Sequence, residues 1–265
     1  MTSRQTLLAV LATLVVAPYA AAQERSSAGD FRWSKPLPAG QWVRLHNISG
    51  DVRVTAVDGD RVEVVGRRRG SSSYDDDDVR VDVHEGRDGA TFCVVYGPDS
   101  WCDDRGSHSE SRGDGRRRRG SIDFEVRLPR RLKLSANSVS GDVQVSGVGD
   151  EVNAASVSGN VRVEGIRAPA VRATSVSGDV DVRIDALTGQ GDLRFTSVSG
   201  DVLLTLPRSL DADFTMKTVS GELDSDFPLT LQGGMSRRSL SGRIGRGGRE
   251  LYLTTVSGDV TLRAR

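Results

Sequence analysis

The stretch Ser175-Val176-Ser177-Gly178-Asp179-Val180 decides the fold, because versions of it recur through the chain. The same six residues stand at 138–143 and 197–202. Ser-Gly followed by a polar residue occurs eight times, with the glycines at Gly50, Gly141, Gly159, Gly178, Gly200, Gly221, Gly242 and Gly258. A motif that returns about every 20 residues indicates a stacked repeat architecture.

Hydrophobic residues keep fixed positions around each of these glycines. With the glycine as zero, positions −7, −5, −2, +2 and +4 around Gly178 are Val171, Ala173, Val176, Val180 and Val182. Across the eight repeats all but three of these forty positions are hydrophobic, in a chain that is 37% hydrophobic overall. The three exceptions are Ser225, Arg237 and Arg246, two of them around Gly242.

This spacing predicts that each repeat is a strand, a corner and a second strand. Positions −7 and −5 share one face of a strand, and +2 and +4 share one face of the next. The odd step from −5 to −2 predicts a corner or bulge between them. One narrow apolar face cannot be buried by a single repeat, so the repeats must stack. The predicted fold is therefore all-β: a β-solenoid of stacked Ser-Gly-Asp repeats, on the order of 40 Å long.

A strand-rich insertion separates the first repeat from the rest. We expect a first rung at 41–57, inserted strands and loops at 58–133, and main repeats at 134–265. The insertion contains alternating segments that read as antiparallel or solenoid-edge strands. They are Arg61–Val65, Val79–Val83, Thr91–Tyr96 and Ile122–Leu128. Charged loops are expected at 66–78, 86–89 and 103–120, the last disordered, with arginine runs that are either solvated or hold acidic groups.

The N-terminal segment has the pattern of a secretory signal peptide. Arg4 precedes an apolar run from Thr6 to Ala17, and Ala20-Ala21-Ala22 supplies small residues for cleavage. The run is shorter than the ~20 residues of a membrane span, which is the alternative interpretation. We therefore expect a signal peptide at 1–22, a linker at 23–40, and an exported protein without stable membrane insertion.

The two cysteines, Cys93 and Cys102, flank a Gly-Pro turn. In an oxidising compartment they are expected to form a disulfide, and two free thiols are the alternative. No metal site and no cofactor are predicted, because the chain has no Cys-x-x-Cys motif and its three histidines are scattered.

The repeats resemble a known family. Ser-Val-Ser-Gly-Asp-Val, with Thr-Val-Ser-Gly at 218–221 and 255–258, is similar to the bacterial putative-adhesin family of β-solenoid domains of unknown function, related to toast-rack domains. The resemblance covers residues 40–265 and implies an extracytoplasmic, non-enzymatic domain, with no catalytic residue to carry over. The repeat around Gly242 departs from the family pattern.

Position +1 is the candidate contact site. In-register stacking would place a row of acids beside a row of serines at −1. The corner acids are Asp51, Asp142, Asp179, Asp201, Glu222 and Asp259. One interpretation is structural: Asp and Ser side chains accept backbone N–H groups, as in Asx-turns. The alternatives are a weak calcium line and an edge that faces carbohydrate.

Composition narrows the function. The chain has 36 basic and 36 acidic residues, which argues against a nucleic-acid partner bound through net charge. An enzyme is disfavoured because the acids belong to the corner motif and hydrolase motifs are missing. Two interpretations remain: a periplasmic scaffold or sensor that binds an envelope protein, and a surface adhesin that binds glycan or host surface. The chain ends at Arg265 without a translocator barrel or sorting signal, which favours the first.

The last rung, ending in Thr-Leu-Arg-Ala-Arg, has no covering repeat after it in the sequence. It is therefore predicted to be an open edge that meets another copy or a strand of an envelope protein.

Overall fold

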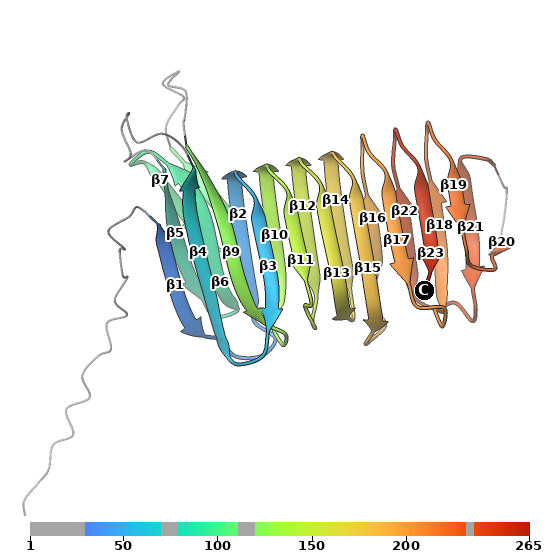
Figure 1. Ribbon diagram of the computed structural model, residues 1–265, viewed down its shortest axis with the longest axis horizontal. Coiled ribbons are helices and arrows are strands. Elements are labelled where there is room, and N and C mark those ends of the chain that lie inside the picture. Colours follow the sequence, from blue (N-terminus) through green and yellow to red (C-terminus); the bar gives the residue numbers. More distant parts are fainter. Residues whose placement is uncertain (1–29, 70–78, 111–119, 232–235) are drawn as a thin grey trace, which may run out of the picture.

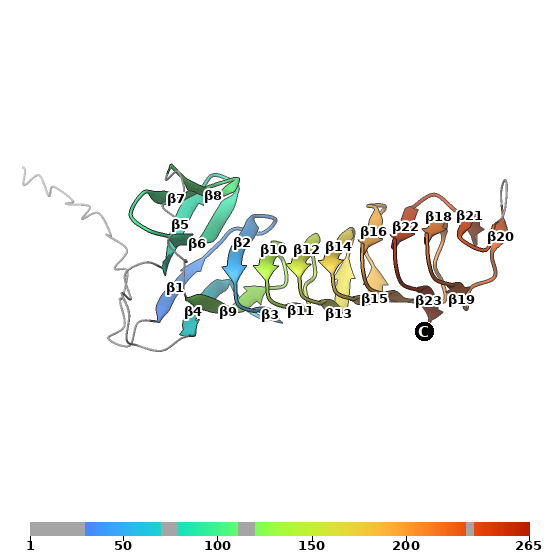
Figure 2. The ribbon, with the colours of Figure 1, turned by 90° about the horizontal axis from the view of Figure 1, so that it is seen from above.

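Two long β-sheets lie against each other along a rod, with a small hairpin at one end (Figures 1 and 2). The structure is a computed structural model that describes residues 30–69, 79–110, 120–231 and 236–265. The regular elements of these residues are strands, which confirms the predicted all-β solenoid. Within the described ranges no helix is long and apolar enough to cross a membrane. The predicted signal peptide lies outside the described residues.

Each of the seven stacked rungs contributes one strand to each sheet, and further strands extend the sheets at their ends. In spatial order the first sheet is β1 (Phe31–Pro36), β4 (Arg61–Arg69), β9 (Ser121–Pro129), β3 (Val52–Val57), β11 (Val143–Ser146), β13 (Val161–Ala168), β15 (Val180–Leu187), β17 (Val202–Leu206), β23 (Val260–Ala264) and β19 (Leu223–Ser225). The second is β20 (Thr230–Leu231), β21 (Ser239–Ile244), β18 (Ala212–Lys217), β22 (Glu250–Thr254), β16 (Leu193–Thr196), β14 (Val171–Ser177), β12 (Val152–Ser158), β10 (Lys133–Ser140), β2 (Trp42–Ser49), β6 (Gly89–Tyr96) and β5 (Val79–Gly86). A separate two-stranded sheet is formed by β7 (Ser100–Asp103) and β8 (Gly106–Ser109).

Equivalent residues of successive rungs pair side by side. Val143 pairs with Val161, Val161 with Val180, and Val180 with Val202, all in parallel register. These four side chains are fully buried between the sheets. Burying a valine contributes about 1.5–3 kcal/mol, so a column of them drives the stacking.

The spatial order of the rungs differs from their order in the sequence. β23 pairs with β17 on one side and β19 on the other, and β22 lies between β16 and β18. The last repeat is therefore inserted before the Gly221 repeat. The Gly221 repeat has a short second strand, β19, with Ser225 at an inward position. This repeat suits the end of the first sheet, because β19 has no neighbouring strand on its outer side there.

This insertion overturns the prediction of an open C-terminal rung. β23 is bonded along both edges, so its backbone is not available to another strand. The Gly242 repeat also differs from prediction. Gly242 lies inside β21, which runs antiparallel to β18 and covers that end of the second sheet. The arginines around it are used in ion pairs, Arg243 with Asp213 and Arg246 with Asp211.

The N-terminal end is closed by antiparallel strands. The expected linker at 23–40 is wrong for its second half, because β1 pairs antiparallel with β4 and Trp33 packs its ring edge-on against Phe92. The four predicted strands of the insertion correspond to β4, β5, β6 and β9. Two loop predictions need correction: Arg67–Arg69 belong to β4, and 106–109 form β8. Residues 70–78 and 111–119 lie outside the described residues.

The corner glycines allow the rungs to approach closely. Gly178 has φ +151°, and a Cβ there would overlap the carbonyl oxygen of Gly159 in the preceding rung. Gly59 also has a positive φ, +123°, but a Cβ there would meet nothing within 4 Å. A substitution at Gly59 therefore tests the effect of backbone conformation alone, whereas one at Gly178 tests conformation and close packing together.

Gly178→Ala is expected to destabilise the protein by at least about 3 kcal/mol, because the new methyl group pushes two rungs apart as well as straining φ. Gly59→Ala has only the conformational cost, about 1 kcal/mol. Urea unfolding of both variants measures the difference. Equal losses would show that the corner does not depend on close approach.

Candidate interaction surface

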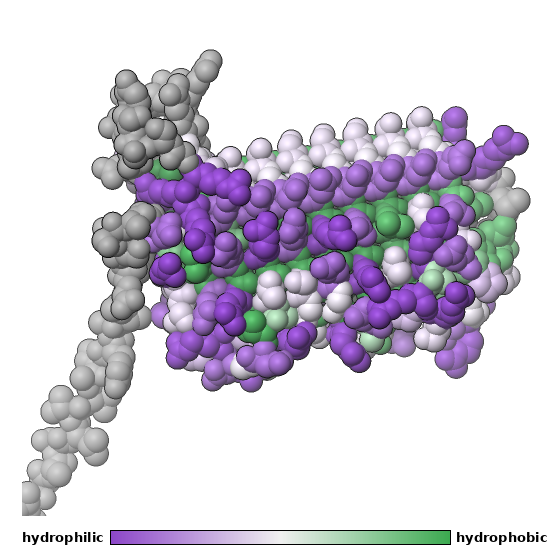
Figure 3. Space-filling view, in the orientation of Figure 1, coloured by the Kyte–Doolittle hydropathy of each residue, from purple (hydrophilic) through white to green (hydrophobic). Residues whose placement is uncertain are grey.

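The Ser-Gly-Asp corners form one edge of the rod, along which equivalent side chains make parallel rows. The corner backbone is held between rungs: the N–H of Gly178 donates to Ser199 O at 2.9 Å, and that of Gly159 donates to Ser177 O at 3.1 Å. The seven corners stack in the order Gly50, Gly141, Gly159, Gly178, Gly200, Gly258 and Gly221. Figure 3 shows these rows running the length of the rod.

The acids at +1 are bonded to the backbone of the next rung. The backbone N–H of each +1 residue donates to the Oδ1 atom of the equivalent residue in the neighbouring rung, so the bond is made between corners rather than within one. Asp123 is the acceptor at the N-terminal end of the row, and Glu222, at the other end, contributes only its N–H. The distances are 2.9 Å (Asp51 to Asp123), 3.1 Å (Asp142 to Asp51), 2.8 Å (Asn160 to Asp142), 2.9 Å (Asp179 to Asn160), 2.9 Å (Asp201 to Asp179), 2.8 Å (Asp259 to Asp201) and 2.8 Å (Glu222 to Asp259). Asn160 fits because only an acceptor oxygen is needed.

A second polar row lies inside the corner, at −3. The Ser175 hydroxyl donates to Gly159 O at 2.8 Å, and Ser197 donates to Gly178 O at 2.9 Å. Each of the seven stacked corners has a donor here: Asn47, Ser138, Ser156, Ser175, Ser197, Thr255 and Thr218. These side chains are buried. This row was not predicted, although its signal is the first serine of each Ser-Val-Ser-Gly in the sequence.

Ser175→Ala is expected to lower the free energy of unfolding by about 1–3 kcal/mol, because it leaves the buried carbonyl of Gly159 without that donor. The matched control is Ser177→Ala, two residues later, whose side chain is exposed. Chemical denaturation of both variants measures this. If Ser177→Ala were the more damaging change, the assignment of inner and outer serines would be wrong.

The hydrophobic residues at −2 are exposed. In the rungs of β2, β10, β12 and β14 the expected corner between −5 and −2 is absent, because the first strand continues through the buried −3 residue to the serine before the glycine. In the other three rungs the first strand, β16, β18 or β22, ends at −4, but the −3 residue is still buried. Alternation along a strand then directs −2 outward. We call these side chains the valine row; in stacking order they are Val139, Val157, Val176, Val198, Val256 and Val219, with 41–61% exposure.

The rows beside the valines are small and mostly uncharged. On one side are the exposed serines at −1, followed around the corner by the acids at +1. On the other side, at −4, five successive rungs carry Asn137, Ala155, Thr174, Thr196 and Thr254. The valine row is therefore an apolar line with acids on one flank only.

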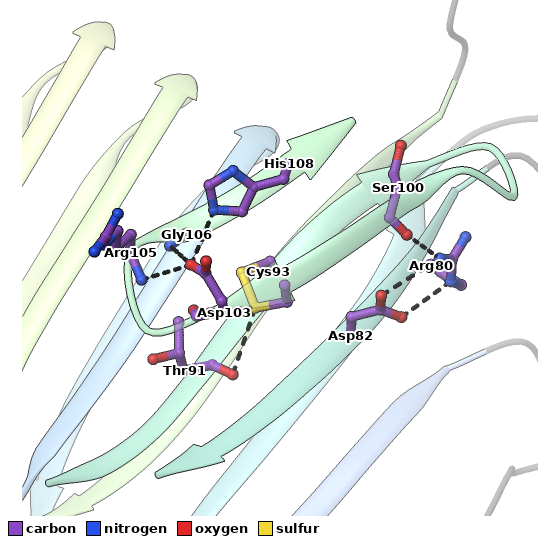
Figure 4. The surroundings of a disulfide bond; sticks show 10 residues. Arg80, Asp82, Thr91, Cys93, Ser100, Asp103, Arg105, Gly106 and His108 are labelled. Carbon is purple, nitrogen blue, oxygen red and sulfur yellow. Dashed lines mark hydrogen bonds and ion pairs between the residues drawn. A yellow bond between two sulfur atoms is a disulfide. The ribbon is translucent and has the colours of Figure 1, made fainter. Parts of the chain in front are cut away.

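A disulfide-bonded hairpin lies at the N-terminal end (Figure 4). Cys93 in β6 and Cys102 in β7 are joined, with their Cα atoms 5.7 Å apart, as predicted. Trp101 is 42% exposed and stacks on His108, with ring centroids 5.5 Å apart. The hydrogen bond from His108 is the main cause that lowers the pKa of Asp103.

A family model described as Toastrack DUF4097 matches residues 23–263. The chain belongs to this family. No curated protein matches it.

Two solved structures are similar to this Toastrack chain. One is described as a putative cell adhesion protein from Clostridium sporogenes; it is 9% identical, has a TM-score of 0.50, and the match covers 89% of this chain and 100% of that one. The other, described as a putative adhesin from Bacteroides fragilis, is 12% identical with a TM-score of 0.40, covering 89% and 97%. At such identity the first likeness concerns the fold alone.

A cleft of about 630 Å³ lies at the opposite edge of the Toastrack rod, lined in part by Arg249, Gly189 and Asp211. Arg249 is only 4% exposed, and its guanidinium donates to the carbonyls of Pro169, Gly189 and Gly191. Burial lowers the pKa of Arg249, and the nearby Asp192 acts in the opposite direction. The arginine therefore ties loops of three rungs together.

Arg249→Met is expected to lower the free energy of unfolding by about 2–4 kcal/mol, since three carbonyls lose a charged donor. Arg246→Met is the control: its side chain is 92% exposed and pairs with Asp211, so little change is expected. Thermal and urea melts compare the two. If Arg249→Met left the free energy of unfolding unchanged, water would have replaced the guanidinium as the donor to these carbonyls at no cost.

In the described part of the chain, no three His, Cys, Asp or Glu residues are grouped so as to hold a metal ion.

Proposed function

We propose that the protein is an exported, non-enzymatic scaffold of the cell envelope that binds a protein through the valine row. The observation that carries this proposal is the row itself: six in-register valines, exposed, on one edge. They are six of the nine large hydrophobic side chains exposed among the described residues. Contiguous exposed apolar surface marks protein interaction sites, whereas scattered single residues do not.

The row is suited to a protein partner because it is rigid. Val139, Val157 and Val176 lie on strands, and the carbonyls of Val176, Val198 and Val256 accept the N–H groups of Ser199, Ser257 and Ser220 in the neighbouring rungs. Valine also has few rotamers to lose. Binding therefore costs little conformational entropy. A glycan would more often be met by aromatic rings, whereas the exposed apolar side chains of this row are all valines.

Export and the absence of catalysis rest on different observations. The disulfide between Cys93 and Cys102 is typical of an oxidising compartment, and the N-terminal pattern of the sequence predicts secretion. The corner acids are used as backbone acceptors, so they are not placed as a catalytic pair. We place this scaffold in the periplasm, because a scaffold of the cell envelope would bind its partner there.

The test is site-specific photo-crosslinking in the native envelope. A photoreactive residue at Val176 should crosslink to one or a few proteins, identified by mass spectrometry, and Val198→Thr should reduce those crosslinks several-fold. The matched control position is Leu203, exposed on the outer face of the other sheet. Each identified protein is then purified and titrated against the wild type and the Val198→Thr variant. Equal crosslinking from positions 176 and 203 would contradict the proposal.

A second candidate is a surface adhesin that binds glycan, favoured by the exposed Trp101 stacked on His108 at the end of the rod. A flat exposed ring offers an apolar face to a sugar. In a glycan array, binding that is lost in Trp101→Ala and kept in Val176→Thr would favour this candidate. Binding to no glycan would exclude it.

A further inference from the structure

We propose that the partner of the valine row is a second copy of this chain, lying alongside with the two rods parallel. The inference rests on the proposed function, because it names the protein that the same surface binds. Its basis is the period of the row, the side chains that flank it and their charge.

The period of the row matches that of another solenoid. Neighbouring rungs place the valines about 4.7–4.9 Å apart along the rod. A strand laid along the row would present one side chain to it about every 6.6 Å, since alternate residues point away. A helix would repeat every 5.4 Å and drift out of register. Only a second ladder of rungs keeps six contacts in register.

The valine side chains fit a self-complementary contact. They are of one size, in line, and exposed to a similar degree from Val139 to Val256. Rows of identical β-branched side chains on paired sheets can interdigitate and exclude water. A contact between identical surfaces is also the common form of a twofold dimer.

Charge selects the parallel arrangement. A twofold axis along the rods sets the serine and acid flank of one copy against the −4 flank of the other, which carries Thr174, Thr196 and Thr254. A twofold axis across the rods would instead bring both rows of acids to the same side of the contact. Like charges facing each other are unfavourable, and hydroxyl groups can donate to carboxylates.

The contact is narrow, so the dimer is expected to be weak. One row of half-exposed valines with its flanks falls below the ~800 Å² per partner of a standard stable interface. We therefore expect a reversible dimer with a dissociation constant on the order of 100 μM. The free energy gained by burying the valines would then only slightly exceed the entropic cost of association.

Sedimentation equilibrium on the purified exported protein, from about 10 μM to about 1 mM, tests the dimer. The wild type should shift from monomer toward dimer. The double variant Val176→Thr/Val198→Thr should remain monomeric over this range, or dimerise at least tenfold more weakly. Leu203→Thr, on the other sheet, should behave as wild type. All three positions are exposed, so the substitutions are expected to leave the melting temperature unchanged. Thermal melts of the variants serve as the control that they are folded.

Crosslinking tests the direction of the rods. Val139→Cys and Val219→Cys lie near opposite ends of the row and are each treated with a bismaleimide that spans about 10 Å, the spacing of facing sheets. Parallel rods predict a crosslinked dimer of each variant alone and none between the two variants when mixed. Crosslinks only in the mixture would overturn the parallel arrangement.

Failure of this inference is distinguishable from failure of the proposed function. A wild type that stays monomeric to about 1 mM overturns the second-copy inference. A dimer that the double variant does not weaken also overturns it, since the contact then lies elsewhere. In either case the proposed function stands if position 176 still crosslinks to another envelope protein, and it falls with the inference if positions 176 and 203 behave alike.

Discussion

The close approach of successive glycine corners is the constraint on which the rest of the structure depends. At Gly178 and its equivalents, the backbone of one rung touches the carbonyl of the preceding rung where a Cβ would not fit. This contact fixes the register, so equivalent residues pair across all the rungs. Because register is fixed at the corner, every position counted from the glycine becomes a row, whether buried, hydrogen-bonded or exposed.

Two rows of polar side chains supply hydrogen-bond partners to the backbone of each corner. The buried hydroxyl at −3 satisfies the glycine carbonyl, and the oxygen at +1 accepts an N–H from the next rung. A bend in which backbone groups leave the sheet ladders would otherwise bury them without partners, at a cost of about 1–3 kcal/mol each. The motif Ser-Val-Ser-Gly-Asp therefore supplies most of the hydrogen-bond partners of one corner. Its second serine is exposed, and its valine is the apolar exception, an exposed hydrophobic residue outside the core.

That exception is where we place the function. These valines lie outside the core, where a polar residue would be equally soluble, yet six rungs carry the same apolar side chain at this position. Since the rung made by β22 and β23 is inserted before the one made by β18 and β19, the row is continuous even though the chain visits its positions out of order. The surface belongs to the assembled rod and to no single segment of the sequence.

The sequence by itself determined the repeat, the corner glycines and the inward columns, because these depend on local spacing and on burial that each repeat shares. It also placed the four strands of the insertion and the cysteine pair. It did not determine the order of the last rungs, since any two repeats have matching edges and the choice depends on connector length and on which rung tolerates the rod end. Nor did it distinguish the inward column at −5 from the exposed row at −2, because valine and alanine suit both sides of a strand. Only the tertiary structure decided which of the two positions is exposed, because the corner lies at the glycine and the side chain at −2 points into solvent.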